Sequence, residues 1–175
     1  MDLTERTVKK NTVYRGKIIS LRVDDALLPD GNPCRRELVE HPGGASVLYV
    51  EEGKVLLVKQ YRYAYGEETL EIPAGKLNPG EDPAATAARE LSEETGRTPA
   101  RVEHLFTIYP TPGYTNEKIY IYRAHGVTGG APHPDEDEFV SAAFYPLEEA
   151  RAMIYDGRIR DAKTIIAVLS LFQSA

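Results

Sequence analysis

The stretch from Gly75 to Arg97 constrains this chain most, because a turn-rich loop there runs directly into a helix that carries three glutamates. Asp82 is a favourable N-cap, and Pro83 suits the first helical position, where its missing N–H costs nothing. Gly96 is a natural helix end. The sequence therefore predicts a helix that begins after Asp82 and ends at Gly96.

Two faces of this helix differ in character. Small apolar residues recur at spacings of three and four and make a packing face: Ala84, Ala87, Ala88 and Leu91. Glu90, Glu93 and Glu94 fall on another face, about one turn apart, so their carboxylates converge. Two carboxylates ~5 Å apart repel by roughly 3 kcal/mol at an effective dielectric near 20. A solvated acidic face is one interpretation; the other is a hard cation held by oxygen ligands, Mg²⁺ or Mn²⁺.

The spacing around the helix resembles the signature box of the Nudix hydrolases, which reads Gly, five residues, Glu, seven residues, then Arg-Glu-Leu-x-Glu-Glu-x-Gly. The matching residues are Gly75, Glu81, Arg89, Glu90, Leu91, Glu93, Glu94 and Gly96. One position departs, because the residue after the box is usually aliphatic and here is Arg97. The resemblance implies an α/β/α sandwich that hydrolyses a nucleoside diphosphate linked to another moiety, with Mg²⁺ or Mn²⁺ held by the helix glutamates.

Composition narrows the class of protein. The 175 residues suffice for one domain with a core, and the net charge of −6 argues against a general nucleic-acid or anionic-membrane binder. The single cysteine, Cys34, excludes an internal disulfide and fits a cytoplasmic setting. Residues 1–11 lack a signal-peptide core, and the longest apolar run, Ile165 to Phe172, is too short to span a bilayer.

Patterns outside the box predict a mixed sheet between helices. Tyr14–Leu28 and Arg35–His41 are expected to form an N-terminal antiparallel hairpin, and Ala45–Val50 and Val55–Gln60 a second hairpin. Further strands are expected at Thr69–Pro73, Val102–Tyr109, Lys118–Ala124 and Phe139–Tyr145, helices at Leu147–Tyr155 and Asp161–Gln173, and a surface loop at Gly126–Asp137. Residues 1–42 are predicted to be an N-terminal region for dimerisation and substrate contacts, and residues 43–175 the Nudix hydrolase domain.

Features outside the box resemble the ADP-ribose pyrophosphatase branch. They are Gln60–Arg62, the lead-in Glu68–Gly75, Pro112 fifteen positions after Arg97, and an acidic segment at Asp135–Val140 like the branch's catalytic loop. The resemblance implies hydrolysis of ADP-ribose to AMP and ribose 5-phosphate by a homodimer with exchanged N-terminal strands. The main alternative is another nucleotide sugar such as GDP-mannose. The complete set of box carboxylates disfavours a non-catalytic ADP-ribose sensor, and an enzyme that removes oxidised nucleoside triphosphates would not need the N-terminal hairpin or Pro112.

The same resemblance gives the box and the acidic loop their roles. Glu90 and Glu94 are expected as direct metal ligands, and Glu93 as a further ligand and catalytic residue. The Ala74 carbonyl is a further candidate ligand, because the glycine after it lets the backbone approach an ion. Two or more ions are expected, since one can polarise the phosphate while another activates water. The general base is predicted to be Glu136, with Glu138 as second choice.

The predicted substrate contacts lie outside the box, and each has a structural alternative. Arg62 is a candidate for the diphosphate or ribose, or else forms a surface salt bridge. Glu71 is a candidate for a metal-bound water or a ribose hydroxyl, or else is an exposed strand carboxylate. Arg36 and Glu37 are candidates for the adenine edge, or else pair across strands, and Pro112 marks the substrate class. The expected partner is a small nucleoside diphosphate derivative.

Overall fold

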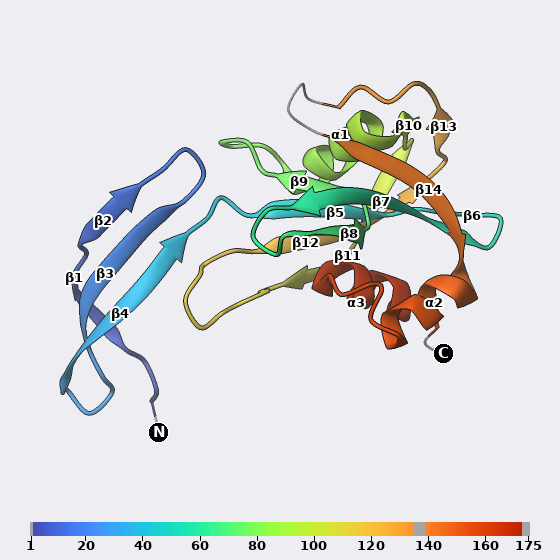
Figure 1. Ribbon diagram of the computed structural model, residues 1–175. Coiled ribbons are helices and arrows are strands. Elements are labelled where there is room, and N and C mark those ends of the chain that lie inside the picture. The colour runs from blue at the N-terminus through green and yellow to red at the C-terminus, as the bar shows by residue number, and fades with distance from the viewer. Residues whose placement is uncertain (1, 135–138, 173–175) are drawn as a thin grey trace. The chain divides into compact units, whose positions relative to one another are not determined.

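A computed structural model describes residues 2–134 and 139–172 of the chain, which fall into two compact units (Figure 1). The first unit comprises the residues up to Gly43 together with Tyr109–Lys118. The second comprises Gly44–Ile108 and the residues from Ile119 onward. No helix in the described ranges is long and apolar enough to cross a membrane.

The first unit is built on a four-stranded antiparallel sheet. Strand β3 (Ser20–Leu27) pairs along one edge with β4 (Pro33–Glu40) and along the other with β1 (Arg6–Lys9) and β2 (Thr12–Arg15). The predicted hairpin is confirmed for β3 and β4. It was too simple, however, because a turn in which the Gly16 N–H donates to the Ile19 carbonyl at 2.8 Å breaks the expected first strand in two.

In the part of the second unit that the structure describes, there are two four-stranded sheets and a short strand pair. One sheet has the order β11 (Arg101–Ile108), β12 (Ile119–His125), β5 (Gly44–Leu48), β9 (Ala74–Lys76), and only β12 and β5 are parallel. The other consists of β14 (Val140–Pro146), β7 (Lys54–Arg62) and β6 (Val50–Glu51), with β8 (Glu67–Glu71) also paired to β7. The mixed α/β prediction is therefore confirmed.

Three strand predictions were wrong in detail. Only β6 forms the expected hairpin with β7, because the chain leaves one sheet for the other at Tyr49. The buried strand β5 instead finds partners at both edges, in β12 and β9. Strand β9 lies in what the sequence indicated was loop. The same holds for β13 (Thr128–Gly129), which pairs with β10 (Arg97–Thr98).

Within residues 44–134 and 139–172, three helices cover the sheets of the second unit, with α1 (Pro83–Thr95) on one side and α2 (Leu147–Tyr155) and α3 (Ala162–Ser170) on the other (Figure 1). The α1 caps are as predicted: Asp82 accepts a hydrogen bond from the Ala84 N–H, and Gly96 adopts a left-handed φ of 70°. The helix is therefore specified at both ends by local sequence.

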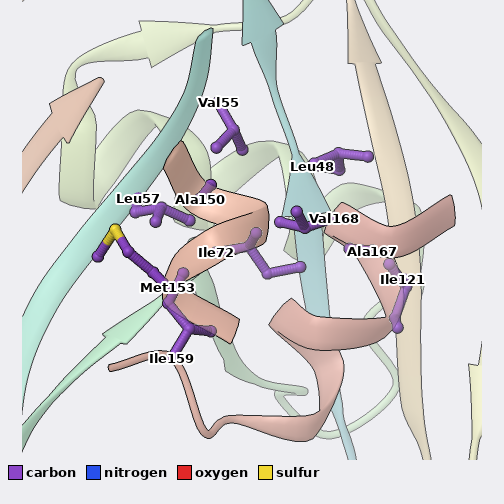
Figure 2. Packing of buried hydrophobic residues seen from close by; sticks show 10 residues of the cluster. All are labelled: Leu48, Val55, Leu57, Ile72, Ile121, Ala150, Met153, Ile159, Ala167 and Val168. Carbon is purple, nitrogen blue, oxygen red and sulfur yellow. The ribbon is translucent and has the colours of Figure 1, made fainter. Parts of the chain in front are cut away.

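Two apolar clusters hold the helices in place. Figure 2 shows the cluster beneath α2 and α3, where Met153 and Val168 meet Leu57 and Ile121 from the strands. In the second cluster, Leu91 of α1 packs with residues of β5 and β7, among them Leu56. Burying one large apolar side chain stabilises a fold by about 1.5–3 kcal/mol, so this packing fixes α1 against the sheet.

Candidate active site

The acidic face of α1 is buried against the chain that leads into it. Glu90 and Glu94 are each only 5% exposed. The Ala74 N–H donates a hydrogen bond of 3.2 Å to Glu94 Oε2. The interpretation of these glutamates as a solvated acidic face is therefore wrong for Glu90 and Glu94, which lie side by side against β9.

Gly75 lies where the Glu90 carboxylate needs room. A β-carbon at this position would be 1.9 Å from Glu90 Oε1 and 2.1 Å from its Cδ, far inside any real contact. Only glycine lets the backbone approach the carboxylate this closely. The first glycine of the box thus has a steric reason: it makes space for the Glu90 carboxylate on the facing helix.

Arg89 is the centre of an ion-pair cluster beside this face. Its guanidinium lies 3.0 Å from Glu81 Oε1, 2.6 Å from Glu93 Oε2 and 2.9 Å from Glu90 Oε1. Hydrogen bonds from Arg89 lower the pKa of Glu81 to about 2, helped by the Asn78 N–H. Arg89 therefore offsets the repulsion among the box carboxylates and orients three of them.

A second cluster surrounds Glu71, which is 2% exposed. Arg62 donates from Nε to Oε1 at 2.7 Å and from a terminal nitrogen to Oε2 at 2.6 Å. The Thr69 hydroxyl donates to Oε1 at 2.6 Å, and Lys163 Nζ forms an ion pair with Oε2. Burial acts to raise the pKa of Glu71, but the bonds from Arg62 and the charge of Lys163 outweigh it and lower the pKa to about 2. Glu71 is therefore ionised at neutral pH.

A cavity of about 350 Å³ lies next to the acidic face, between the C-terminal end of α1 and β14. Its lining is mostly apolar, with Glu94, Thr95, Arg97 and Ser141 as polar members. The Arg97 guanidinium lies 4.7 Å from the ring centroid of Phe144, so this arginine takes up an aromatic contact in place of the aliphatic packing expected after the box. Because Glu94 belongs to both, the cavity and the acidic face form one site.

Comparison with known proteins identifies the family. Residues 24–168 match the model of the NUDIX domain. This chain belongs to the Nudix family. Residues 5–39 also match the model of the nucleoside diphosphate sugar hydrolase N-terminal domain, which covers most of the first unit's sheet.

Relatives of this Nudix protein match it over nearly its whole length. It is 43% identical to the methanol dehydrogenase activator of Bacillus methanolicus, over 94% of this chain and 90% of the relative. It is 41% identical to the ADP-ribose pyrophosphatase of Bacillus subtilis (strain 168), over 95% and 91%. The crystal structure of an ADP compounds hydrolase has the same fold, with a TM-score of 0.85 at 20% identity over 98% of this chain and 95% of that one.

The structure brings some of the predicted site residues together and leaves others apart. Around the Nudix helix it gathers Glu90, Glu94, Glu93 and Ala74. Arg62 and Glu71, predicted as separate contacts, form an ion pair with each other, and the alternative of an exposed carboxylate is wrong for Glu71. The predicted bases Glu136 and Glu138 lie outside the described residues.

The remaining predicted contacts lie in the first unit. Arg36 is exposed and donates two hydrogen bonds to Glu5, the nearer pair of atoms 2.5 Å apart. Glu37 is exposed on β4, opposite Val23, and Pro112 is exposed in a turn. Their roles toward substrate stay predictions.

Sequence reasoning missed Lys163. In the expected helix at Asp161–Gln173, Asp161 and Lys163 are charged residues at the start of an otherwise apolar segment. That local signal gives no partner, because Lys163 reaches a carboxylate 92 residues earlier in the chain. Only the tertiary fold shows which carboxylate it meets.

Nudix hydrolases generally need a divalent metal ion, and the acidic face fits one. Within the described ranges, no three His, Cys, Asp or Glu side chains converge closely enough to hold an ion by themselves. Mg²⁺ does not require that, since proteins usually hold it with one or two carboxylates, water and substrate phosphates. The carboxylates of Glu90 and Glu94, buried against β9, are hard oxygen donors of this kind.

Proposed function

We propose that this protein hydrolyses the diphosphate bond of ADP-ribose, giving AMP and ribose 5-phosphate. The observation that carries the proposal is the pair of buried carboxylates, Glu90 and Glu94, packed against Gly75 and Ala74 beside a cavity. The substrate class is supported by two relatives described as ADP-ribose pyrophosphatases, at 41% identity and, in Mycobacterium tuberculosis, at 34% over 94% of this chain.

In this proposal Glu90 and Glu94, with the Ala74 carbonyl and Glu93, hold two or more Mg²⁺ or Mn²⁺ ions. Bound ions would polarise a phosphate and lower the pKa of the attacking water. Arg89 keeps Glu93 and Glu81 in place through its ion pairs.

Arg62 and the acidic loop supply the other proposed roles. Arg62 presents a guanidinium to the diphosphate oxygens, which suits its planar fork of donors. Glu136 takes the proton from the attacking water, with Glu138 as the second choice. Glu71 acts through Arg62, since its oxygens are already engaged by three donors.

The proposal is tested by incubating the protein with Mg²⁺ and ADP-ribose and measuring AMP and ribose 5-phosphate. We expect kcat/KM for ADP-ribose to exceed that for GDP-mannose by at least about tenfold, or ~1.4 kcal/mol of transition-state binding. GDP-mannose is the sharpest comparison, because Yersinia pestis GDP-mannose pyrophosphatase is 35% identical over 75% of this chain. Faster turnover of GDP-mannose would favour that alternative, and no hydrolysis of either would contradict the proposal.

Glu136→Gln should lower kcat by about 10²–10⁴-fold while KM changes little, because the amide cannot accept a proton from water. Glu138→Gln is the matched control, with the same change two residues away, and should cost far less. Initial rates at saturating ADP-ribose measure both. A larger effect at Glu138 would move the base there, and wild-type rates in both variants would place it elsewhere.

A second candidate function follows from the relative in Bacillus methanolicus, whose description is methanol dehydrogenase activator and whose identity is 43%. Methanol oxidation by such a dehydrogenase, measured with this protein and with its Glu94→Gln variant, separates that function from simple ADP-ribose hydrolysis. Activation that survives the loss of hydrolysis would make the two functions independent.

The first unit is proposed to form a homodimer interface. Its match to a nucleoside diphosphate sugar hydrolase N-terminal domain supports a role specific to this class. Apolar side chains on its described strands and turns are exposed, among them Val8, Val13 and Ile18. Light scattering that gave a monomer would contradict the proposal.

A further inference from the structure

We propose that Lys163 is a positioning residue: it fixes the Glu71 carboxylate, which in turn holds Arg62 ready for the substrate's diphosphate. The inference rests on the proposed function, because the contact between Arg62 and a diphosphate belongs to it. It adds that a residue of α3, on the side of the sheets away from α1, orients the arginine that makes this contact (Figure 1).

Lys163 is placed as an internal cation. It lies in the first turn of α3 and is 6% exposed, and its Nζ forms an ion pair with Glu71 and lies 3.0 Å from Asp161 Oδ1. Lysine is almost never this buried unless it is paired, since removing the ammonium from water is costly. Lys163 therefore serves its two carboxylates and not the solubility of the surface.

The carboxylate of Glu71 passes this restraint to Arg62. Lys163 binds Oε2 and Thr69 binds Oε1, so both oxygens of Glu71 are held by residues other than Arg62. Arg62 then binds both oxygens in a fork, which fixes the plane of its guanidinium. Without Lys163 the carboxylate would lose one of its three holders and could turn, and the guanidinium would turn with it.

The start of α3 is itself anchored, so Lys163 is a rigid support. Asp161 caps the helix by accepting from the Thr164 N–H at 2.9 Å. The Thr164 hydroxyl accepts a hydrogen bond of 2.8 Å from the Ile72 N–H, directly after β8. Helix α3 and the strand that carries Glu71 are thus joined by two independent contacts, one ionic and one through the backbone.

The outer edge of Arg62 lies on the side of the proposed site. Residues of a strand alternate between faces, so Arg62 shares a face of β7 with Leu56, which packs in the cluster of α1. Its side chain is 40% exposed, and its remaining terminal nitrogen, Nη1, makes no hydrogen bond within the described ranges. Two nitrogens of the Arg62 guanidinium therefore bind Glu71, and the third is available for an anionic group.

Such an arrangement lowers the cost of binding. A free arginine loses rotamer freedom when it grips a phosphate, whereas one already held in its bound orientation does not. The role of Lys163 is thus to prepare Arg62 before the substrate arrives. This predicts that removing Lys163 weakens substrate binding only while Arg62 is present.

A double-mutant cycle tests the inference. The dissociation constant of α,β-methylene-ADP-ribose, which cannot be hydrolysed, is measured with Mg²⁺ for wild type, Lys163→Met, Arg62→Ala and the double variant. We expect Lys163→Met to weaken binding about tenfold, Arg62→Ala by at least as much, and the double variant to match Arg62→Ala within about twofold. Lys163→Arg, which keeps the charge, should recover part of the loss.

The matched control is Lys59→Met, which removes the exposed ion pair between Lys59 and Glu68 on β7 and β8. It should change the dissociation constant by less than about twofold. If Lys163→Met fails to fold in thermal melting, Thr69→Val removes another hydrogen bond from the same carboxylate and should weaken binding about threefold, again only when Arg62 is present.

Three outcomes would overturn the inference. They are a folded Lys163→Met variant that binds like wild type, losses that multiply in the double variant, and an Arg62→Ala variant that binds like wild type. A wild-type protein that hydrolyses ADP-ribose while Lys163→Met binds normally would remove this inference alone. A wild-type protein that neither hydrolyses ADP-ribose nor binds the analogue would remove the proposed function together with it.

Discussion

Glu94→Gln is expected to lower kcat for ADP-ribose by about 10³-fold or more. The amide has the size of the carboxylate and can still accept the hydrogen bond from the Ala74 N–H, so the local packing is kept. It lacks the negative charge that would hold a divalent cation, whose stabilisation of the transition state amounts to several kcal/mol. A loss of about 4 kcal/mol corresponds to about 10³-fold in rate. Initial rates as a function of Mg²⁺ concentration measure the effect.

The matched control for Glu94→Gln is Glu148→Gln on α2, which makes the same chemical change at a side chain that is 77% exposed. It should leave kcat and the Mg²⁺ dependence unchanged, and thermal melting should show both variants folded. Wild-type turnover by Glu94→Gln would remove this carboxylate from the metal site and, with it, the main support for the proposed chemistry.

Glu93 and Glu94 have different surroundings, although both belong to the box. The Glu93 side chain is 23% exposed and is paired with Arg89, whereas Glu94 is buried against Ala74. The sequence does not distinguish the two glutamates, because spacing along a helix predicts which face a side chain lies on but not what packs against that face. The position of β9 against α1 separates them.

Local rules explain why the helix and the box could be predicted so well. Asp82, Pro83 and Gly96 determine where α1 begins and ends, and each residue does so through contacts within one helical turn. The acidic face follows from the helical period alone. The mixed sheet follows from the order of strands and helices, which the pattern of apolar residues also gives.

What the sequence could not provide depends on contacts between distant segments. The pairing of Arg62 with Glu71 requires the register of β7 and β8, and the ion pair with Lys163 joins residues 92 positions apart. Strand β5 was assigned to the wrong partner because its apolar run fits any buried strand equally well. In each case the residue type was informative and its partner was not.

A protein with a net charge of −6 repels a phosphate substrate, and the two arginine clusters bear on how that repulsion is offset. Arg89 is already ion-paired with the box carboxylates of Glu81, Glu90 and Glu93. Arg62 shares Glu71 with Lys163, and it uses Nε and one terminal nitrogen for that ion pair, which leaves the other terminal nitrogen for an anionic group. Arg89 therefore supports the ligands, and Arg62 is the better candidate to meet the substrate.

Gly75→Ala should lower kcat by about 10²-fold with little loss of stability. The new methyl group would lie 1.9 Å from Glu90 Oε1, and real contacts of this kind are essentially never under 3.0 Å, so the carboxylate must move by about 1 Å. The carboxylate is the far end of a flexible side chain, and Gly75 has no left-handed φ, so the backbone can accept alanine. A misplacement of about 1 Å in a catalytic arrangement can cost about 10²-fold in rate.

The control for Gly75→Ala is Gly129→Ala, where a β-carbon would meet no atom within 4 Å and φ is not left-handed. Thermal melting should give both variants a midpoint near that of wild type, whereas kcat and the Mg²⁺ concentration needed for half-maximal rate should change only in Gly75→Ala. A Gly75→Ala variant that unfolds would mean that the glycine serves the fold, and one with wild-type rates would mean that the place of the Glu90 carboxylate is irrelevant to catalysis. The expected combination, a stable protein with a displaced carboxylate and slow turnover, would tie the glycine of the box directly to the chemistry.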